Sequence, residues 1–560
     1  MKKILSLLVI AILFANCTKE DKVVGLITDK AMVVSARVEA SKIGSDILKK
    51  GGNAYDAMIA TQLGLAVVYP VAGNIGGGGF MVFRHHNGKS GALDFREKAP
   101  LSSDKDMYLD EKGEVIPGKS SFGVHSSGVP GSVAGIVEVY KKYGSLPFKD
   151  LVQPAIDLAR NGFKVTKKQA RSLNGTRKRF EKANNYKILF DKKWKEGDLL
   201  KQEELAQTLE RIRDNGRDGF YKGKTADLIV DYQKELGGII THQDLEKYQA
   251  IWRKPIVFDY KGYKITSMTM PASGGICLAQ ILKSVEPYDF SEIDHNSTKY
   301  IQLLTEAQRR SYADRAHYLG DMDFVNVPID SLIAPKYIAE RMSTFSWDKA
   351  TKSSDVSHGK VLGYESDETT HYSIIDQFGN AVSVTTTLNT GYGSKVLVKG
   401  AGFFLNNEMD DFSAKPGVPN VYGLLGSTAN AIAPEKRMLS SMTPTIVEKD
   451  GKLKMVVGTP GGSTIITSVL QNILNVVEYD MGMQESVNKA RFHHQWMPDN
   501  IRMEPNGFDS ITKVNLKKLG YELLERNSLI IGRVDAILVL PNGKLEGGAD
   551  PRGDDAAVGF

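Results

Sequence analysis

The chain has 560 residues, of which 41% are hydrophobic and 25% are charged, a composition typical of a globular protein with a large core. Its formal net charge is +6, a small surplus for this length. The densest basic run, residues 164–195, is interrupted by acidic residues and lacks interleaved aromatic residues at the spacing that would stack on bases. It indicates a solvated helical face, and no nucleic-acid partner is expected.

The N-terminus has the features of an export signal. Lys2 and Lys3 precede an apolar run, residues 4–15, that is too short to span a bilayer and resembles a signal-peptide core. The run ends beside Asn16-Cys17, which resembles the lipobox of bacterial lipoproteins. We therefore predict a lipoprotein-type signal peptide over residues 1–17, with Cys17 as the lipidation site. The alternative is an ordinary secretory signal with an incidental cysteine.

This signal predicts export to the periplasmic or cell-surface side of a bacterial membrane, with membrane contact only through the lipid anchor. The other cysteine, Cys277, would then have no disulfide partner in the chain, so the fold must be stable without a disulfide. Cys277 is predicted to be a small core residue.

The first half of the chain is predicted to be mainly helical. Apolar periodicity predicts helices at 33–50, 56–68, 147–161 and 298–318, and short strands at 80–84 and 91–95. The first helix is expected to stop at Gly51-Gly52.

The pattern changes near residue 350. Residues 350–368 are polar, lack hydrophobic periodicity and are predicted to form a mobile linker. Strands follow: residues 372–375 and 381–388 form one predicted hairpin, and residues 444–447 and 453–457 form a second. Helices are predicted at 463–477 and 483–491.

Thr369 stands where the linker meets the first strand. A threonine hydroxyl is a weak nucleophile, but a free α-amine on the same residue can accept its proton near neutral pH. This N-terminal threonine chemistry requires the chain to be cut directly before the residue. A flexible segment before Thr369 and a strand after it suit such a cut. Alone, a Thr-Thr pair at a strand start is weak evidence, because threonine favours strands.

Several further segments carry a family resemblance. The sequence Asp367-Glu368-Thr369-Thr370-His371-Tyr372-Ser373 is very similar to the autocleavage motif of γ-glutamyltransferases. Other segments resemble signatures of the same family in the same order: residues 73–80, 94–100, 406–412, 416–423, 439–445, 458–463 and 550–560. The resemblance extends from about residue 25 to the C-terminus.

The resemblance implies the N-terminal nucleophile hydrolase fold, an α+β four-layer αββα sandwich. It also implies a heterodimer formed by autocleavage of one precursor between Glu368 and Thr369, with a large subunit of residues 18–368 and a small catalytic subunit of residues 369–560. The implied activity is that of a γ-glutamyltransferase and glutathione hydrolase. Such an enzyme transfers the γ-glutamyl group of glutathione and related compounds to water or to amino acids and peptides. The kinetics should be ping-pong.

The family motifs also imply roles for individual residues. Thr369 is the nucleophile, Thr387 is expected beside it, and the backbone N–H groups of Gly461 and Gly462 suit an oxyanion. The α-carboxylate of the substrate would meet Arg96, Ser440 and Ser441, because a planar guanidinium matches a carboxylate. The α-ammonium would meet Asp411, Glu408 and Asn389, and Tyr422 belongs to the lid-like segment 416–423. Considered alone, Arg96 could equally form a salt bridge with Glu97 or Asp94.

No cofactor is implied, and no metal requirement is predicted. The glycine run 76–79 lacks a following Gly-Lys-Ser/Thr, so a close-packed turn is favoured over a phosphate loop. The pairs His85-His86 and His493-His494 lack the spacing that places two imidazoles on one helical face.

Three alternatives stay open. Cephalosporin and glutaryl acylases share the fold and nucleophile but bind side chains without an α-ammonium, and Asp411 and Glu408 argue against them. Poly-γ-glutamate transpeptidases are also related, although the full lid-like segment favours a small substrate. The third alternative is a lipid-anchored binding protein with an unprocessed site.

Overall fold

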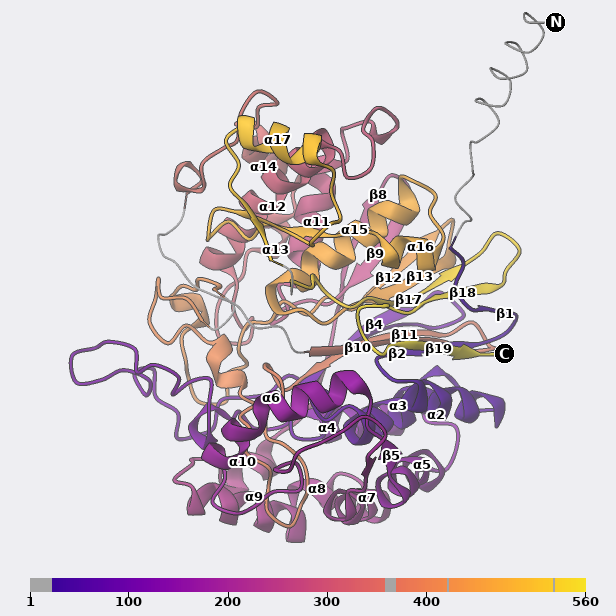
Figure 1. Ribbon diagram of the computed structural model, residues 1–560, viewed down its shortest axis with the longest axis vertical. Helices are drawn as coiled ribbons and strands as arrows, with labels where there is room; N and C mark the ends of the chain where they lie inside the picture. The colour runs from indigo at the N-terminus through magenta and orange to yellow at the C-terminus, as the bar shows by residue number, and fades with distance from the viewer. Residues whose placement is uncertain (1–22, 358–368, 421–422, 527–528) are drawn as a thin grey trace, which may run out of the picture.

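Two seven-stranded sheets lie face to face at the centre of the molecule, and helices cover the outer face of each (Figure 1). The computed structural model describes residues 23–357, 369–420, 423–526 and 529–560. The architecture is the predicted α+β four-layer αββα sandwich. Each sheet combines strands from before and after Thr369, so neither half of the chain completes a sheet alone.

The two central sheets are named here after one inner strand of each. The β13 sheet contains, in spatial order, β1 (Ile27–Thr28), β18 (Leu545–Gly548), β17 (Asp535–Val539), β13 (Lys452–Gly458), β12 (Thr445–Lys449), β9 (Tyr263–Ser267) and β8 (Ile256–Tyr260). The β10 sheet contains β19 (Ala556–Gly559), β2 (Met32–Ser35), β10 (Thr369–Ile375), β11 (Ala381–Thr387), β3 (Gly78–Arg84), β4 (Ser90–Asp94) and β7 (Ile251–Arg253).

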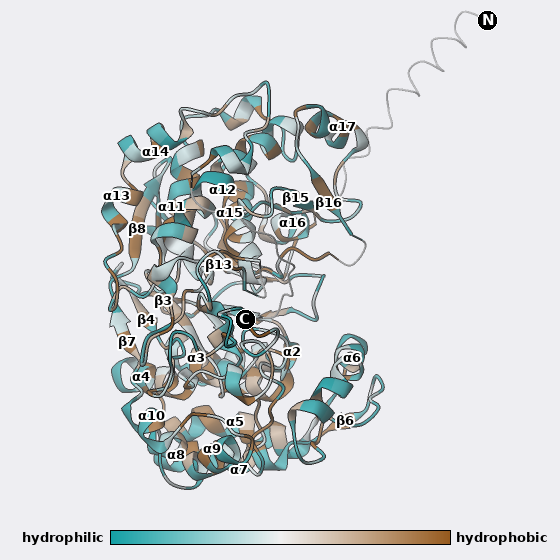
Figure 2. Cartoon of the chain, turned by 90° about the vertical axis from the view of Figure 1, so that its left-hand side faces the viewer, coloured by the Kyte–Doolittle hydropathy of each residue, from teal (hydrophilic) through white to brown (hydrophobic). Residues whose placement is uncertain are grey.

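Two groups of helices form the outer layers (Figure 1). The β10 sheet is covered by α2 (Val38–Lys49), α3 (Ala54–Val68), α4 (Ser132–Tyr143), α5 (Phe148–Asn161) and α7 (Glu203–Asn215). The β13 sheet is covered by α11 (Gly274–Val285), α12 (Thr298–Tyr318), α15 (Ile465–Val477) and α16 (Met483–Asn488). Hydrophilic residues dominate the outermost helices, among them α6 (Lys167–Ala183), α14 (Pro335–Met342) and α17 (Ser510–Lys518) (Figure 2). None of the described helices is long and apolar enough to cross a membrane.

Alternation along β10 decides which side chains reach the space between the sheets. Tyr372 and Ile374 belong to the core beneath the helices, whereas Ile375 packs in the apolar layer between the sheets. His371 lies against Gly458 of β13, where an added Cβ would fall 2.2 Å from the imidazole. Because side chains alternate along a strand, Thr369 shares the inward face of β10 with His371.

The structure confirms most of the predicted elements. The helices α5 and α12 and both hairpins lie where the sequence pattern places them, and Cys277 is a buried free cysteine of the core. The helix predicted at residues 33–50 is wrong at its start. Its first residues belong to strand β2, and the helix begins only at Val38. All four β2 residues are buried between neighbouring strands, an environment that overrides the helical pattern.

The predicted mobile linker is wrong for its first residues. The backbone N–H of Ala350 donates to the carbonyl of Leu519, and the backbone N–H of Ser353 donates to Asp499 Oδ2. Trp496 Nε1 also donates to the carbonyl of Ser353, which is itself buried. These contacts tie residues 350–356 to the C-terminal part of the chain. Residues 358–368 of the predicted linker lie outside the described residues.

Candidate active site

Thr369 and Thr387 face each other at one end of the central hairpin. They are register partners, as the first residue of β10 and the last of β11, and their Oγ1 atoms are 3.5 Å apart. Thr387 Oγ1 also accepts a hydrogen bond from the backbone N–H of Asn389 at 2.7 Å. Both threonines are only 3% exposed. The Thr387 hydroxyl is therefore fixed beside the Thr369 hydroxyl, as the family motifs predict.

The glycine run 76–79, which leads into β3, lets the chain pack closely behind this pair of threonines. An added Cβ on Gly77 would lie 2.0 Å from the carbonyl oxygen of Thr387, and one on Gly78 would lie 2.5 Å from the carbonyl of Phe95. Only glycine fits such an approach. Gly76 and Gly77 thus form the close-packed bend that the sequence predicts, whereas Gly78 and Gly79 belong to β3. The run supports the strand end that carries Thr387.

Thr369 lines a small cavity beside Thr387. The residues that line it are Arg96, Arg315, Thr369, Thr387, Asn389, Glu408, Asp411, Leu424, Ser440, Ser441, Met442, Gly462 and Ile465. The cavity brings together all six residues predicted to bind substrate, both predicted threonines and one of the two predicted oxyanion glycines. They come from segments that are far apart in the sequence.

Three carboxylates surround one guanidinium in the cavity wall. Arg96 Nη1 lies 2.6 Å from Glu408 Oε2 and 3.4 Å from Glu97 Oε2, and Arg96 Nη2 lies 2.5 Å from Asp411 Oδ2. The side chains of Arg96, Glu97 and Glu408 are at most 1% exposed, and that of Asp411 is 11% exposed. The salt bridge between Arg96 and Glu97 that the sequence allowed is present, together with two more. The group has three carboxyl groups to one guanidinium, an arrangement that can hold a cationic ligand.

Burial governs the ionisation of this cluster. It raises the pKa of Glu408 well above its usual range and that of Glu97 to about 7, and it also raises the pKa of Asp411. The positive charge of Arg96 opposes these shifts. Burial would lower the pKa of Arg96, but the carboxylates more than offset this and raise it. A bound ammonium would favour ionised carboxylates in the same way.

A second guanidinium, Arg315, lies at the cavity wall. It extends from α12, and its Nη2 donates to Ser441 Oγ at 3.1 Å. Sequence reasoning missed this residue, because a charged residue in a long helix is indistinguishable in the pattern from one on a solvated face. Leu424, Met442 and Ile465, which supply apolar lining, were also missed.

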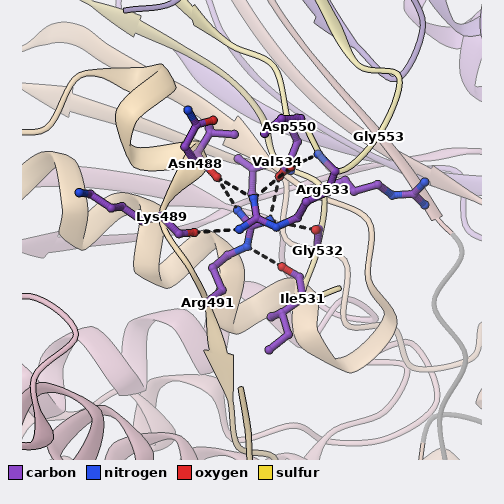
Figure 3. Close-up of polar contacts among 12 residues, drawn as sticks. Asn488, Lys489, Arg491, Ile531, Gly532, Arg533, Val534, Asp550 and Gly553 are labelled. Carbon is purple, nitrogen blue, oxygen red and sulfur yellow. Dashed lines mark hydrogen bonds and ion pairs between the residues drawn. The ribbon is translucent and has the colours of Figure 1, made fainter. Parts of the chain in front are cut away.

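The turn that carries the predicted oxyanion donors rests on a buried ionic network. Gly461 has φ of 136°, and an added Cβ there would lie 3.2 Å from Gly532 Cα. Arg491 Nη2 donates to the Gly532 carbonyl at 3.0 Å and to Asp550 Oδ2 at 2.8 Å, as Figure 3 shows. The loop behind Gly461 and Gly462 is therefore fixed by a fully buried arginine.

Three of the predicted functional residues, Cys17, Glu368 and Tyr422, lie outside the described residues. The described neighbours of Tyr422 reach the site, because Asn420 Nδ2 donates to Asp411 Oδ1 at 3.2 Å and Leu424 lines the cavity. Within the described part of the chain, no group of three or more His, Cys, Asp or Glu residues is arranged to hold a metal ion.

Comparison with known proteins agrees with this geometry. A glutathione hydrolase proenzyme of Escherichia coli K12 is 46% identical over 95% of this chain and 92% of its own length. The solved cephalosporin acylase of Bacillus halodurans superposes with a TM-score of 0.85 at 25% identity, covering 98% of each chain. A solved chain of Helicobacter pylori γ-glutamyltranspeptidase is 44% identical with a TM-score of 0.57, covering 61% of this chain and 96% of its own. The family model described as Gamma-glutamyltranspeptidase matches residues 40–560. The matched family model, the relatives, and the paired threonines beside a cavity lined by carboxyl groups agree, and the chain belongs to the γ-glutamyltranspeptidase family.

Proposed function

We propose that this protein is an autoprocessing γ-glutamyltransferase and glutathione hydrolase. The observation that carries the proposal is the cavity that joins the Thr369 hydroxyl to the carboxylates of Glu408 and Asp411. A nucleophile at one end and groups for an α-amino acid at the other match a γ-glutamyl donor. The name of the Escherichia coli relative, glutathione hydrolase proenzyme, supports both the substrate and the processing.

Processing begins with Thr369 in the uncut chain. Its hydroxyl attacks the carbonyl of Glu368, the peptide C–N bond breaks, and the Thr369 nitrogen gains a proton as an ester forms. Water then hydrolyses the ester, which releases a carboxylate on Glu368 and restores the Thr369 hydroxyl. The cut separates the chain between Glu368 and Thr369, and the two pieces stay together because both central sheets use strands of both. The solved Helicobacter pylori chain, which covers 61% of this chain, supports a two-piece enzyme.

The free α-amine of Thr369 then acts as the base. It accepts the hydroxyl proton while Oγ1 attacks the γ-carbonyl of the donor, and the N–H groups of Gly461 and Gly462 stabilise the oxyanion. The C–N bond of the donor breaks, and the leaving amine takes the proton. Water or the amine of an acceptor amino acid or peptide then attacks the γ-glutamyl ester. Thr387 holds the nucleophile through its hydroxyl.

Substrate recognition divides the cavity into two parts. The α-ammonium of the donor is placed beside Asp411, Glu408 and Asn389, where its charge would favour ionised carboxylates. The α-carboxylate is placed at the Ser440 and Ser441 hydroxyls and beside Arg96, all of which line the cavity.

An acylase activity is the second candidate, because the Bacillus halodurans cephalosporin acylase shares the fold over nearly its whole length. The two donors γ-glutamyl-p-nitroanilide and glutaryl-p-nitroanilide separate these activities, since the glutaryl group has the same carboxylate but no ammonium. We expect kcat/KM of the purified enzyme to be at least 100-fold higher for the γ-glutamyl donor. Equal values, or a preference for the glutaryl donor, would favour the acylase.

Export and lipid attachment at Cys17 are a further part of the proposal. They are supported by Lys2 and Lys3, the apolar run 4–15 and the position of the cysteine. The native protein should partition into the detergent phase of a Triton X-114 extraction, and Cys17→Ala should move it to the aqueous phase. An unchanged partition would refute lipidation at this residue.

A further inference from the structure

Arg315 is a buried cation at the wall of the Thr369 cavity. It lies near the end of α12, is 4% exposed and lines the cavity together with Ser441. Its Nε donates to Ser273 Oγ at 2.9 Å and its Nη2 donates to Ser441 Oγ at 3.1 Å. These bonds occupy only part of a guanidinium that has five N–H donors.

The charge of Arg315 is not balanced as that of Arg96 is. Among the described residues, Arg96 has three carboxylates within ion-pair distance and Arg315 has none. Burial lowers the pKa of Arg315, against opposing contributions from Cys277, Tyr312 and Asp411. A buried charge without a counter-ion is costly. A site that keeps one beside a cavity is suited to an anionic ligand.

The two cavity serines are oriented as hydrogen-bond donors. Ser441 Oγ accepts from Arg315, and Ser440 Oγ accepts from the backbone N–H of Met442 at 3.2 Å. Because each serine oxygen accepts a hydrogen bond, its own hydroxyl hydrogen must point away from the donor of that bond. Both serines line the cavity, so their hydroxyls are free to donate into it. Two hydroxyl donors beside an unbalanced cation form a site for a carboxylate.

We propose that Arg315 sets the carboxylate specificity of this cavity. It holds Ser441 so that the hydroxyl donates to the α-carboxylate of the donor, and its charge balances that carboxylate. Arg315 is thus a positioning residue for Ser441, distinct from Arg96, whose guanidinium is shared among three carboxylates. The inference rests on the proposed γ-glutamyl transfer and adds the residue that distinguishes donors with an α-carboxylate from donors without one.

The test compares two donors in purified wild type, Arg315→Gln, Arg315→Lys and Ser441→Ala. γ-Glutamyl-p-nitroanilide carries the α-carboxylate, and 4-aminobutyryl-p-nitroanilide keeps the ammonium but lacks the carboxylate. Arg315→Gln should lower kcat/KM for the first donor roughly 10- to 100-fold, mainly through KM, and change that for the second by less than about threefold. Arg315→Lys should give an intermediate loss. Arg341→Gln is the control, because Arg341 pairs with Asp314 away from the cavity.

Coupling gives a readout that a general structural role would not produce. The loss in the Arg315→Gln/Ser441→Ala double variant should be much smaller than the product of the two single losses, because both act through one contact. Parallel losses for both donors, or multiplicative losses in the double variant, would overturn the inference. If Arg315→Gln does not fold, as judged by thermal melting, Arg315→Lys and Ser441→Ala supply the same comparison. A wild type that does not cleave the γ-glutamyl donor would refute the proposed function, and this inference with it.

Discussion

Replacing Asp411 by asparagine should remove the preference for an α-ammonium. Asp411 Oδ2 lies 2.5 Å from Arg96 Nη2, and its side chain is 11% exposed at the cavity wall. The substitution keeps the size of the side chain and removes one of the three carboxyl groups around Arg96. Glu97 and Glu408 stay within ion-pair distance of the guanidinium, so the fold should be retained.

The size of the effect follows from the contact that is lost. A hydrogen bond to a charged group contributes about 1.5–3 kcal/mol, which corresponds to roughly 10- to 150-fold in an equilibrium constant. Glu408 stays near the ammonium, so we expect the lower part of this range. The kcat/KM of Asp411→Asn for γ-glutamyl-p-nitroanilide should fall roughly 10- to 50-fold, while that for glutaryl-p-nitroanilide should change less than about threefold.

Asp410→Asn is the matched control. Asp410 is the neighbouring residue in the same short helix, η4 (Glu408–Asp411), but its Oδ1 accepts from Ser120 Oγ and it does not line the cavity. This variant should keep the wild-type ratio between the two donors. If Asp411→Asn lowered both donors equally, or neither, the assignment of Asp411 to the ammonium would be wrong.

Three further variants test other parts of the site and the fold. Thr387→Val keeps the branched shape but removes the hydroxyl beside Thr369, so kcat should fall roughly 10- to 100-fold, while Thr387→Ser should stay within about fivefold of wild type. Gly461→Ala places a Cβ 2.5 Å from Thr464 Oγ1 at a φ of 136°, so kcat should fall at least about 100-fold; an unchanged kcat would exclude this turn as the oxyanion site. Burial beside Asp555 raises the pKa of Asp535 well above its usual 3.8 and that of Asp555 to about 7. The folded state therefore holds protons that the unfolded state releases above pH 4, so wild-type stability should fall as pH rises from about 4 to 7. Asp535→Asn should have a higher Tm than wild type at pH 8 and the same Tm near pH 4, and an equal difference at both pH values would contradict this assignment.

The sequence predicts the hairpin around Thr369 well because its signals are local. Strand residues on both sides of a glycine-containing loop predict the hairpin, the family motifs predict Thr387 beside Thr369, and the structure has Thr369 and Thr387 in register. The helix at residues 298–318 is equally local, and its bounds agree with α12. Strand β2 was missed because its partners, β10 and β19, lie hundreds of residues away. Local periodicity does not contain that pairing.

In the site, too, motifs predict which residues take part, but the contacts between distant segments appear only in the structure. Family motifs locate Arg96, Glu408, Asp411, Ser440 and Ser441, and all of these line the cavity. The motifs do not show that the Arg96 guanidinium is shared among three carboxylates, because that arrangement depends on how distant segments pack. Nor do they reveal the proposed role of Arg315, whose burial and lack of a carboxylate partner among the described residues appear only once α12 is placed beside Ser441.

The central claim is that Thr369 becomes the N-terminal nucleophile of a γ-glutamyl-transferring enzyme. The most direct measurement is the intact mass of purified wild type beside Thr369→Ala, with turnover of γ-glutamyl-p-nitroanilide on the same samples. We predict two wild-type fragments, the smaller beginning at Thr369, together with turnover, and an uncut, inactive variant. An uncut wild type, or a cut and active Thr369→Ala, would contradict the account.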